Sequence, residues 1–248
     1  MTEETEKTRL RMRRREMWLR DEGLTTLLVA LFLRIFVVSP MAAAGFFGRY
    51  GALVLNLWLA LTLLSGVLAI GWRRKTAQVI VLGAVLLFAW QTFGYAGGKG
   101  TIGLIVDAGL TIFLLSILVA MVAWQIFRDG PITRQRVQGS ITIYLLLGLI
   151  WAQGFTLAAL LKPDSFTVPA GTGQLEVLAR MTYYSFVTLT TVGYGDISPV
   201  SLVTRSLANV EGLIGQLFPA ILIARLVSME IAARQTNTTK DETEKTSE

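Results

Sequence analysis

The chain contains no cysteine and no histidine, and only 16% of its 248 residues are charged. Without cysteine, disulfides and thiolate metal sites are excluded. Without histidine, the commonest acid–base catalyst and metal ligand is missing, so few enzymatic mechanisms remain open. A soluble domain carries roughly a quarter charged residues, whereas this chain is 53% hydrophobic. The composition therefore indicates a membrane protein.

Long apolar runs take the place of the missing charges. Each run is close to or above the ~20 residues that cross the hydrocarbon core of a bilayer. Six runs are present, at about residues 24–46, 52–72, 77–96, 102–127, 138–161 and 201–230. Lys and Arg gather in alternate breaks between them, which predicts an all-α protein with six transmembrane helices and cytoplasmic termini. The net charge of +6 is then explained by a cytoplasmic membrane face and does not indicate a nucleic-acid partner.

The breaks predict four parts along the chain. Residues 1–22 form a basic segment, either an interfacial helix or a flexible tail, on the cytoplasmic side. A four-helix transmembrane domain follows over 23–130, then a second membrane domain over 131–232. Residues 233–248 are polar and are expected to be disordered. The run AAAG at 42–45 could imitate a signal-peptide cleavage site, although Arg34 inside the apolar run argues against cleavage.

The segment between the last two spans has an unusual pattern. Residues 175–189 predict a helix of about 22 Å, too short to cross the bilayer comfortably. The sequence TTVGYGD follows it at 190–196. A half-length helix and a glycine-containing strand between two spans predict a re-entrant loop, which is tolerated at membrane depth only where protein or water surrounds it.

The two glycines of this loop suggest its chemistry. Gly193 and Gly195 allow backbone conformations in which successive carbonyls point the same way. The carbonyls of Thr191, Val192, Gly193 and Tyr194, repeated around an axis, could replace the hydration shell of a cation. Their side chains would point away from the axis, and Tyr194 could pack against Tyr183 or Tyr184 of the short helix.

The stretch 190–196 resembles the signature of potassium channels, and the likeness extends over about residues 137–230. It implies that 131–232 is a pore domain, made of helix 5, a pore helix at 175–189, a filter at 190–196 and helix 6. The filter residues would be Thr191 to Gly195, with Thr190 and Asp196 as support. The resemblance implies a potassium-selective homotetramer of the inner or plasma membrane. Its partners would be three further copies and the lipid, with no cofactor and no small-molecule substrate other than K⁺.

One position departs from the pattern of this family. Some potassium channels carry a pore-helix glutamate that pairs with the aspartate after the filter, and here that position is Val187. Asp196 must then find another partner or stay solvated. The alternative function is a membrane subunit of a potassium uptake or regulatory system. Such transporters carry four degenerate filter segments in one chain, whereas this chain has one intact segment, which favours the channel.

The resemblance also places a glycine hinge in the last helix, at Gly215. Pro219 should kink this helix, and an apolar constriction could close the pore; the alternative is a permanently bent, open helix. Helical spacing predicts the stripe that lines the cavity, which consists of Gln216, Pro219 or Ala220, Ile223 and Val227.

The same helix carries an acid, Glu211, which is a functional candidate by default inside a span. Its position on the helix turns it towards the pore helix, where the hydroxyls of Thr182, Tyr183 or Thr188 are candidate partners. The alternative roles are ion attraction and gating.

The first four spans lack the charges of a voltage sensor. Residues 101–127 contain no Lys or Arg, so we expect weak voltage dependence. The stimulus that opens the pore stays open among lipid, membrane tension, pH and partners. Arg34 in the first span could pair with Asp107 in the fourth. Alternatively, Arg34 extends to the interface.

Overall fold

The computed structural model describes residues 23–70, 75–97, 100–127, 134–167 and 174–245. The basic segment predicted at 1–22 lies outside these residues. The first helix covers 23–43 and includes a π-helical segment Arg34–Val38 (η1) and a short helix Ser39–Ala43 (α2). The later helices are Gly48–Tyr50 (η2), Gly51–Ile70 (α3), Lys75–Gly97 (α4), Thr101–Ile126 (α5), Arg134–Leu161 (α6), Pro163–Ser165 (η3), Gln174–Leu189 (α7) and Leu202–Lys245 (α8).

The prediction of an all-α membrane protein agrees with these helices. In the described residues, the only β-type pairing is an isolated bridge between Phe166 and Pro199. Five helices are long and apolar enough to cross a membrane, namely Gly23–Ala43, Gly48–Val67, Thr101–Ile126, Arg134–Leu161 and Leu202–Met229. In α4, the apolar stretch found among the described residues is shorter, Val81–Thr92. Six crossings therefore stay a prediction.

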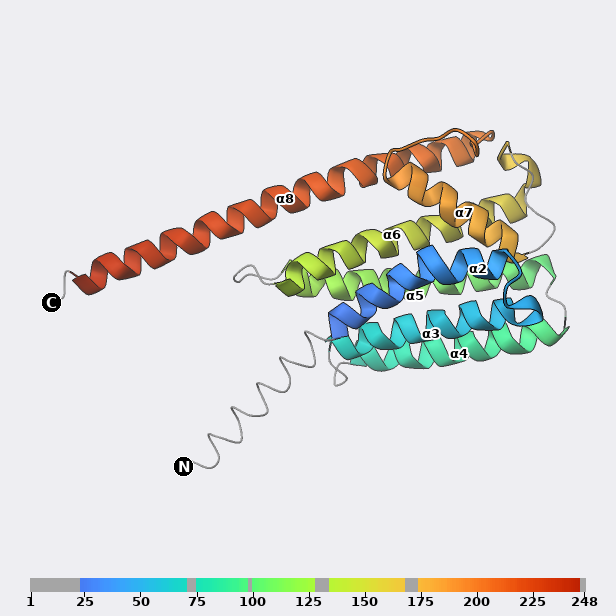
Figure 1. Cartoon of the computed structure of the whole chain (residues 1–248), viewed down its shortest axis with the longest axis horizontal. Coiled ribbons are helices and arrows are strands. Elements are labelled where there is room, and N and C mark those ends of the chain that lie inside the picture. Colours follow the sequence, from blue (N-terminus) through green and yellow to red (C-terminus); the bar gives the residue numbers. More distant parts are fainter. Residues whose placement is uncertain (1–22, 71–74, 98–99, 128–133, 168–173, 246–248) are drawn as a thin grey trace, which may run out of the picture.

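The first helix, α3, α4 and α5 pack as a bundle, and α6 lies along α5 (Figure 1). Buried leucines fill the contacts, among them Leu31, Leu63, Leu118 and Leu146, and they form one core cluster. Lipid is as apolar as leucine, so helices associate here by close packing of small against large residues. Gly66 shows this, because a Cβ at this position would lie 2.5 Å from Leu118. The core is thus continuous from the first helix into α6.

The short helix α7 lies between α6 and α8 at one end of the molecule (Figure 1). An aromatic cluster holds it there: the ring of Tyr184 lies 4.9 Å from that of Phe155 and 5.2 Å from that of Phe166. The chain after residues 190–196 returns to the same place, because the amide of Thr167 donates to the Ser198 carbonyl at 2.9 Å. Both ends of the loop 162–201 are thereby fixed beside α6.

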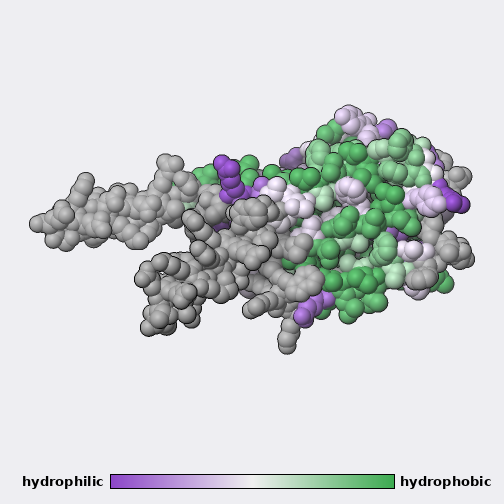
Figure 2. All heavy atoms as spheres, turned by 60° about the horizontal axis from the view of Figure 1, so that its bottom comes forward, coloured by the Kyte–Doolittle hydropathy of each residue, from purple (hydrophilic) through white to green (hydrophobic). Residues whose placement is uncertain are grey.

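The last helix is longer than predicted. Residues 233–248 were expected to be disordered, but α8 continues without a break to Lys245. Composition alone does not predict this continuation, because each residue added to a helix that has already formed gains one backbone hydrogen bond. Only 6% of the apolar window of α8 is buried, against 33–50% for the other four spans. Figure 2 shows that apolar residues also cover much of the visible face of the bundle, with polar residues near its ends.

Candidate functional site

The segment 190–196 leaves the C-terminal end of α7 through a tight turn. The amides of Val192 and Gly193 both point back to the carbonyl of Val187, at 3.0 and 3.3 Å. The amide of Thr191 donates to the carbonyl of Thr188 at 2.9 Å. These bonds satisfy carbonyls that a helix end otherwise leaves without partners. The start of the segment is therefore fixed to α7 by these main-chain bonds and by the Thr190 hydroxyl, which donates to the Phe186 carbonyl at 2.6 Å.

The backbone of this segment alternates between two conformations. Thr191, Gly193 and Gly195 have positive φ angles of 59°, 59° and 81°, whereas Val192 and Tyr194 do not. Glycine adopts such angles readily, but for threonine they are costly. Thr191 is the only such non-glycine residue in the described chain. The two glycines were expected from the sequence, and the left-handed Thr191 was not.

The side chains of the segment face outward from the single chain. Val192 is 52% exposed and Tyr194 is 73% exposed. They line a groove of about 680 Å³ together with Tyr183 and Phe186. The prediction that Tyr184 could support Tyr194 is wrong, because Tyr184 is buried in the aromatic cluster with Phe155 and Phe166. Tyr183 is the tyrosine that shares the groove with Tyr194.

Asp196 has a partner on α7 despite the apolar residue at position 187. Its carboxylate interacts with the phenol of Tyr183, and this interaction raises the pKa of Tyr183. Val187 contributes through its carbonyl oxygen, which accepts the amides of Val192 and Gly193. Tyr183 thus connects α7 to the end of the segment 190–196, where some channels of the resembled family use a glutamate.

Helix α8 touches α7 at one residue that the sequence assigned to a hinge. A Cβ built on Gly215 would overlap the main-chain carbonyl oxygen of Leu189. The same oxygen accepts a hydrogen bond from the Tyr144 hydroxyl of α6 at 3.0 Å. The observed feature of Gly215 is therefore close packing against the end of α7. The helix is uninterrupted through Gly215 and Pro219, and bending there stays a prediction.

Glu211 is fully buried and faces α7, as expected, but its partner differs from the candidates named. Its Oε1 lies 2.5 Å from the hydroxyl of Ser185, which also lies 2.7 Å from the carbonyl of Gly148. Thr182 instead donates to the carbonyl of Leu178 in its own helix. A serine hydroxyl has a single proton. If Ser185 donates this proton to the carbonyl of Gly148, the hydrogen bond between Ser185 and Glu211 must be donated by Glu211. Glu211 is then a neutral carboxylic acid.

The remaining residues of the predicted stripe lie on the exposed side of α8. Gln216 reaches the filter segment, where its Nε2 is 3.4 Å from the hydroxyl of Thr191. Ile223 and Val227 are 61% and 53% exposed in the single chain, and Pro219 is partly buried. The stripe is thus available to line a shared cavity, although nothing in a single chain closes it.

Two arginine contacts further along α8, near its middle, were not predicted. The guanidinium of Arg225 donates to the carbonyl of Phe127 at 2.7 Å and lies 5.0 Å from the centre of its ring. Phe127 is the C-terminal cap of α5, where a cation is favourable. Arg136 of α6 reaches the sulfur of Met229 at 3.5 Å. The distribution of Lys and Arg along the sequence was interpreted as a sign of membrane topology. Nothing in the sequence pointed to these contacts.

The comparisons with known proteins agree with this geometry. A family model described as "Ion channel" (Ion_trans_2) matches residues 144–231. This part of the chain is similar to that ion-channel family. The match includes most of α6, all of α7, the filter segment and the membrane-spanning part of α8. The resemblance to channels is thereby confirmed for this part of the chain, in a protein with several apolar helices.

Two curated proteins are similar to part of the chain. Protein LctB of Bacillus caldotenax is 40% identical over 89 residues, which are 36% of this chain and 60% of that protein. Protein LctB of Geobacillus stearothermophilus is 40% identical over 58 residues, 23% of this chain and 42% of that protein. The chain thus matches less than two thirds of either relative, and their names state no activity. No solved structure matches the chain.

Proposed function

We propose that this protein is a potassium-selective channel formed by four copies of the chain around one axis. The observation that supports this best is the alternation of positive φ angles at Thr191, Gly193 and Gly195. Such alternation turns successive carbonyl groups towards one side. Residues 191–195 would then form the filter, and their carbonyls would replace the water around a dehydrated K⁺.

The exposure of the filter supports the assembly of several copies. Residues 190–196 are all exposed in the single chain. Their free main-chain groups cannot face lipid, since unsatisfied backbone groups cost several kcal/mol in hydrocarbon. One chain supplies one strand, whereas full coordination of a cation needs strands on all sides. Four copies would place the carbonyls towards an aqueous axis and the side chains of Val192 and Tyr194 towards protein.

The residues around the filter would then act as support or as a gate. Thr190, Asp196, Tyr183 and the carbonyl of Val187 fix the filter to α7, whereas Gly215 and Gln216 connect it to α8. Ile223 and Val227 of four copies would line the inner part of the pore and could close it by excluding water. The membrane is the cell membrane, with both termini on the cytoplasmic side.

Ion flux into liposomes tests this proposal. The purified protein is reconstituted, and K⁺ and Na⁺ flux are compared with and without barium, alongside cross-linking to count the copies. We expect barium-sensitive K⁺ flux that exceeds Na⁺ flux at least about tenfold, from cross-linked tetramers. The matched pair Gly193→Ala and Gly212→Ala separates filter from helix, because only Gly193 has a positive φ. Equal K⁺ and Na⁺ flux, or a monomer in the membrane, would contradict the proposal.

A further inference from the structure

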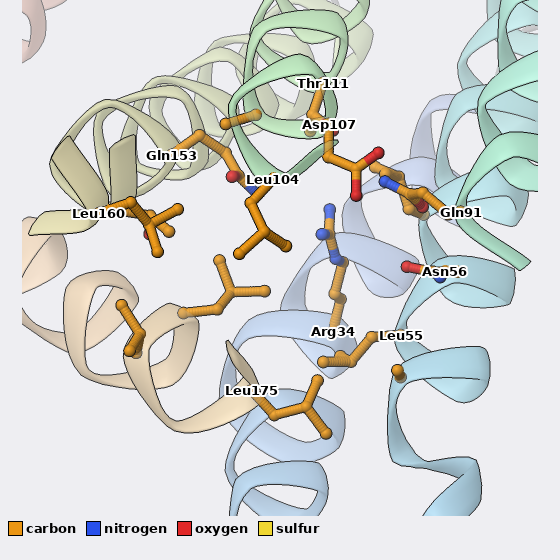
Figure 3. Close-up of a pocket in the computed structure, with 16 residues that line it drawn as sticks. Arg34, Leu55, Asn56, Gln91, Leu104, Asp107, Thr111, Gln153, Leu160 and Leu175 are labelled. Carbon is orange, nitrogen blue, oxygen red and sulfur yellow. The ribbon is translucent and has the colours of Figure 1, made fainter. Parts of the chain in front are cut away.

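A polar cavity of about 70 Å³ lies inside the helix bundle, away from the filter. Polar side chains from five helices line it: the first helix, α3, α4, α5 and α6 (Figure 3). They include Arg34, Asn56, Gln91, Asp107, Thr111 and Gln153. Figure 3 shows the guanidinium of Arg34 directed towards Asp107 and Gln91. Inside a bundle of apolar helices, such a concentration of polar groups requires an explanation.

Two polar atoms of this cavity lack a hydrogen-bond partner. They are Nη1 of Arg34, a donor, and Oε1 of Gln91, an acceptor. Both residues are more than nine-tenths buried, with 5% and 8% of their surfaces exposed. Nη1 of Arg34 makes no hydrogen bond to Asp107, and the ion pair between the two residues stays a prediction. Buried polar groups are nearly always satisfied by protein or by water, so the two atoms indicate an occupant that both accepts and donates hydrogen bonds.

The helix is distorted where it places Arg34 in this cavity. The π-helical segment begins at Arg34, whose carbonyl accepts from the amide of Ser39, five residues later. Single π turns are rare inside α-helices, and those that occur are often found at functional sites. Arg34 also lies near the middle of the span Gly23–Ala43, so its side chain is at membrane depth, far from both helix ends.

The cavity reaches from this depth to one end of the bundle. Ala52 and Leu104 lie in the first turns of α3 and α5, and Leu160 lies in the last turn of α6. Leu175, at the start of α7, lines the same cavity. These residues are at the end where the chain enters and leaves the loop that holds the filter. The cavity therefore extends towards the water on that side of the membrane.

We propose that this cavity is a hydrated binding site that opens at the α6–α7 end of the bundle. It takes water and neutral solutes of similar size that both donate and accept hydrogen bonds. Its volume is room for a few water molecules, at roughly 10–15 Å³ each. A bound ion is not favoured, because Arg34 and Asp107 carry opposite charges in the same space. The occupant accepts from Arg34 and donates to Gln91, and it keeps the guanidinium solvated at membrane depth.

The absence of cysteine from the sequence makes the test direct. Single cysteines are introduced as Asn56→Cys and Gln91→Cys in the full chain, and their reaction with 2-aminoethyl methanethiosulfonate is followed by mass. The thiolate is the reactive form, so a cysteine in contact with water reacts faster than one in lipid. The matched controls are Leu57→Cys and Trp90→Cys, which are neighbours in the same helices with 47% and 50% of the wild-type residues exposed on the apolar surface.

We expect both cavity cysteines to react at least about tenfold faster than their neighbours. If either reacts no faster than its control, the proposal is overturned. A second measurement uses the unaltered protein, in which hydroxyl radicals generated from bound water should oxidise Leu104 of the cavity more than the surface residue Leu110. Equal oxidation of these leucines also overturns it. Neither readout depends on ion conduction, so both are independent of the proposed channel activity.

Discussion

Replacement of Gly215 by alanine is the most informative single change in the channel module. Gly215 lies where α8 crosses the end of α7, and an added Cβ would overlap the carbonyl oxygen of Leu189 and lie 2.8 Å from its carbon. Neither atom can turn away as a flexible side chain could, because both belong to the main chain. Helix α8 or the end of α7 must therefore move, and the filter segment begins at the next residue after Leu189.

The size of the effect follows from this geometry. Ordinary contact begins at 3.4 Å, so the two helices must separate by at least about 0.6 Å, and by more to clear the oxygen. Overpacking of this kind costs about 1–3 kcal/mol. Alanine recovers about 0.5–1 kcal/mol because it favours helix over glycine. We therefore expect a net destabilisation of about 0–2.5 kcal/mol and a larger loss of K⁺ flux, since the separation acts on the filter and on the Tyr144 hydrogen bond to Leu189.

A control exists in the same helix. A Cβ on Gly212 would meet nothing within 4 Å in the chain, so Gly212→Ala should keep or slightly raise stability. Thermal unfolding in detergent and K⁺ flux in liposomes are measured for both variants. If Gly215→Ala matches Gly212→Ala in unfolding temperature and in flux, close packing is not the role of Gly215. Lost gating with normal stability and normal maximal flux would instead favour the hinge.

Two further predictions concern contacts of α8. Ser185→Ala should lower the free energy of unfolding by about 1–3 kcal/mol, because the buried oxygens of Gly148 and Glu211 both lose a partner. Glu211→Gln should cost less, since a neutral amide can still donate to Ser185; equal losses in thermal unfolding would contradict this reading. Arg225→Gln should lower the free energy of unfolding by ~0.5–1 kcal/mol, because it removes both contacts with Phe127 and exposed contacts of this kind contribute about that much. Arg225→Lys should have a smaller effect in thermal unfolding, and unchanged stability in both variants would show that the contact does not hold α8 against α5.

The positions of the helices could be predicted from the sequence because apolar run length and polar breaks determine them. The pore helix illustrates this: 175–189 was predicted, and α7 is Gln174–Leu189. The polar, glycine-containing stretch before it in the sequence and the sequence TTVGYGD after it mark both ends. The tail at 233–248 differs from its prediction for the opposite reason. Its polar composition says that it cannot bury a core, but it does not say whether a preceding helix continues through it.

The partners of individual side chains could not be predicted because they depend on how each helix is rotated. Tyr183 and Tyr184 are neighbours, so they lie about 100° apart around α7. One lines the groove beside Tyr194, and the other is buried in the aromatic cluster. For the same reason, the sequence named Thr182 among the candidate partners of Glu211, whereas the structure places Ser185 beside it. Only the crossing of α6, α7 and α8 decides which side of α7 meets which helix.

The exposed features of the single chain have one physical solution in common. Only 6% of the apolar window of α8 is buried in the single chain. Lipid could cover this apolar surface. Lipid cannot cover residues 190–196, because their main-chain groups need hydrogen-bonding partners or ions. Water could satisfy those groups only if it reached membrane depth, and it reaches that depth only through a channel or cavity enclosed by protein. A ring of copies encloses such a space with the exposed stripe of α8, so the need to solvate the filter itself argues for assembly around an axis.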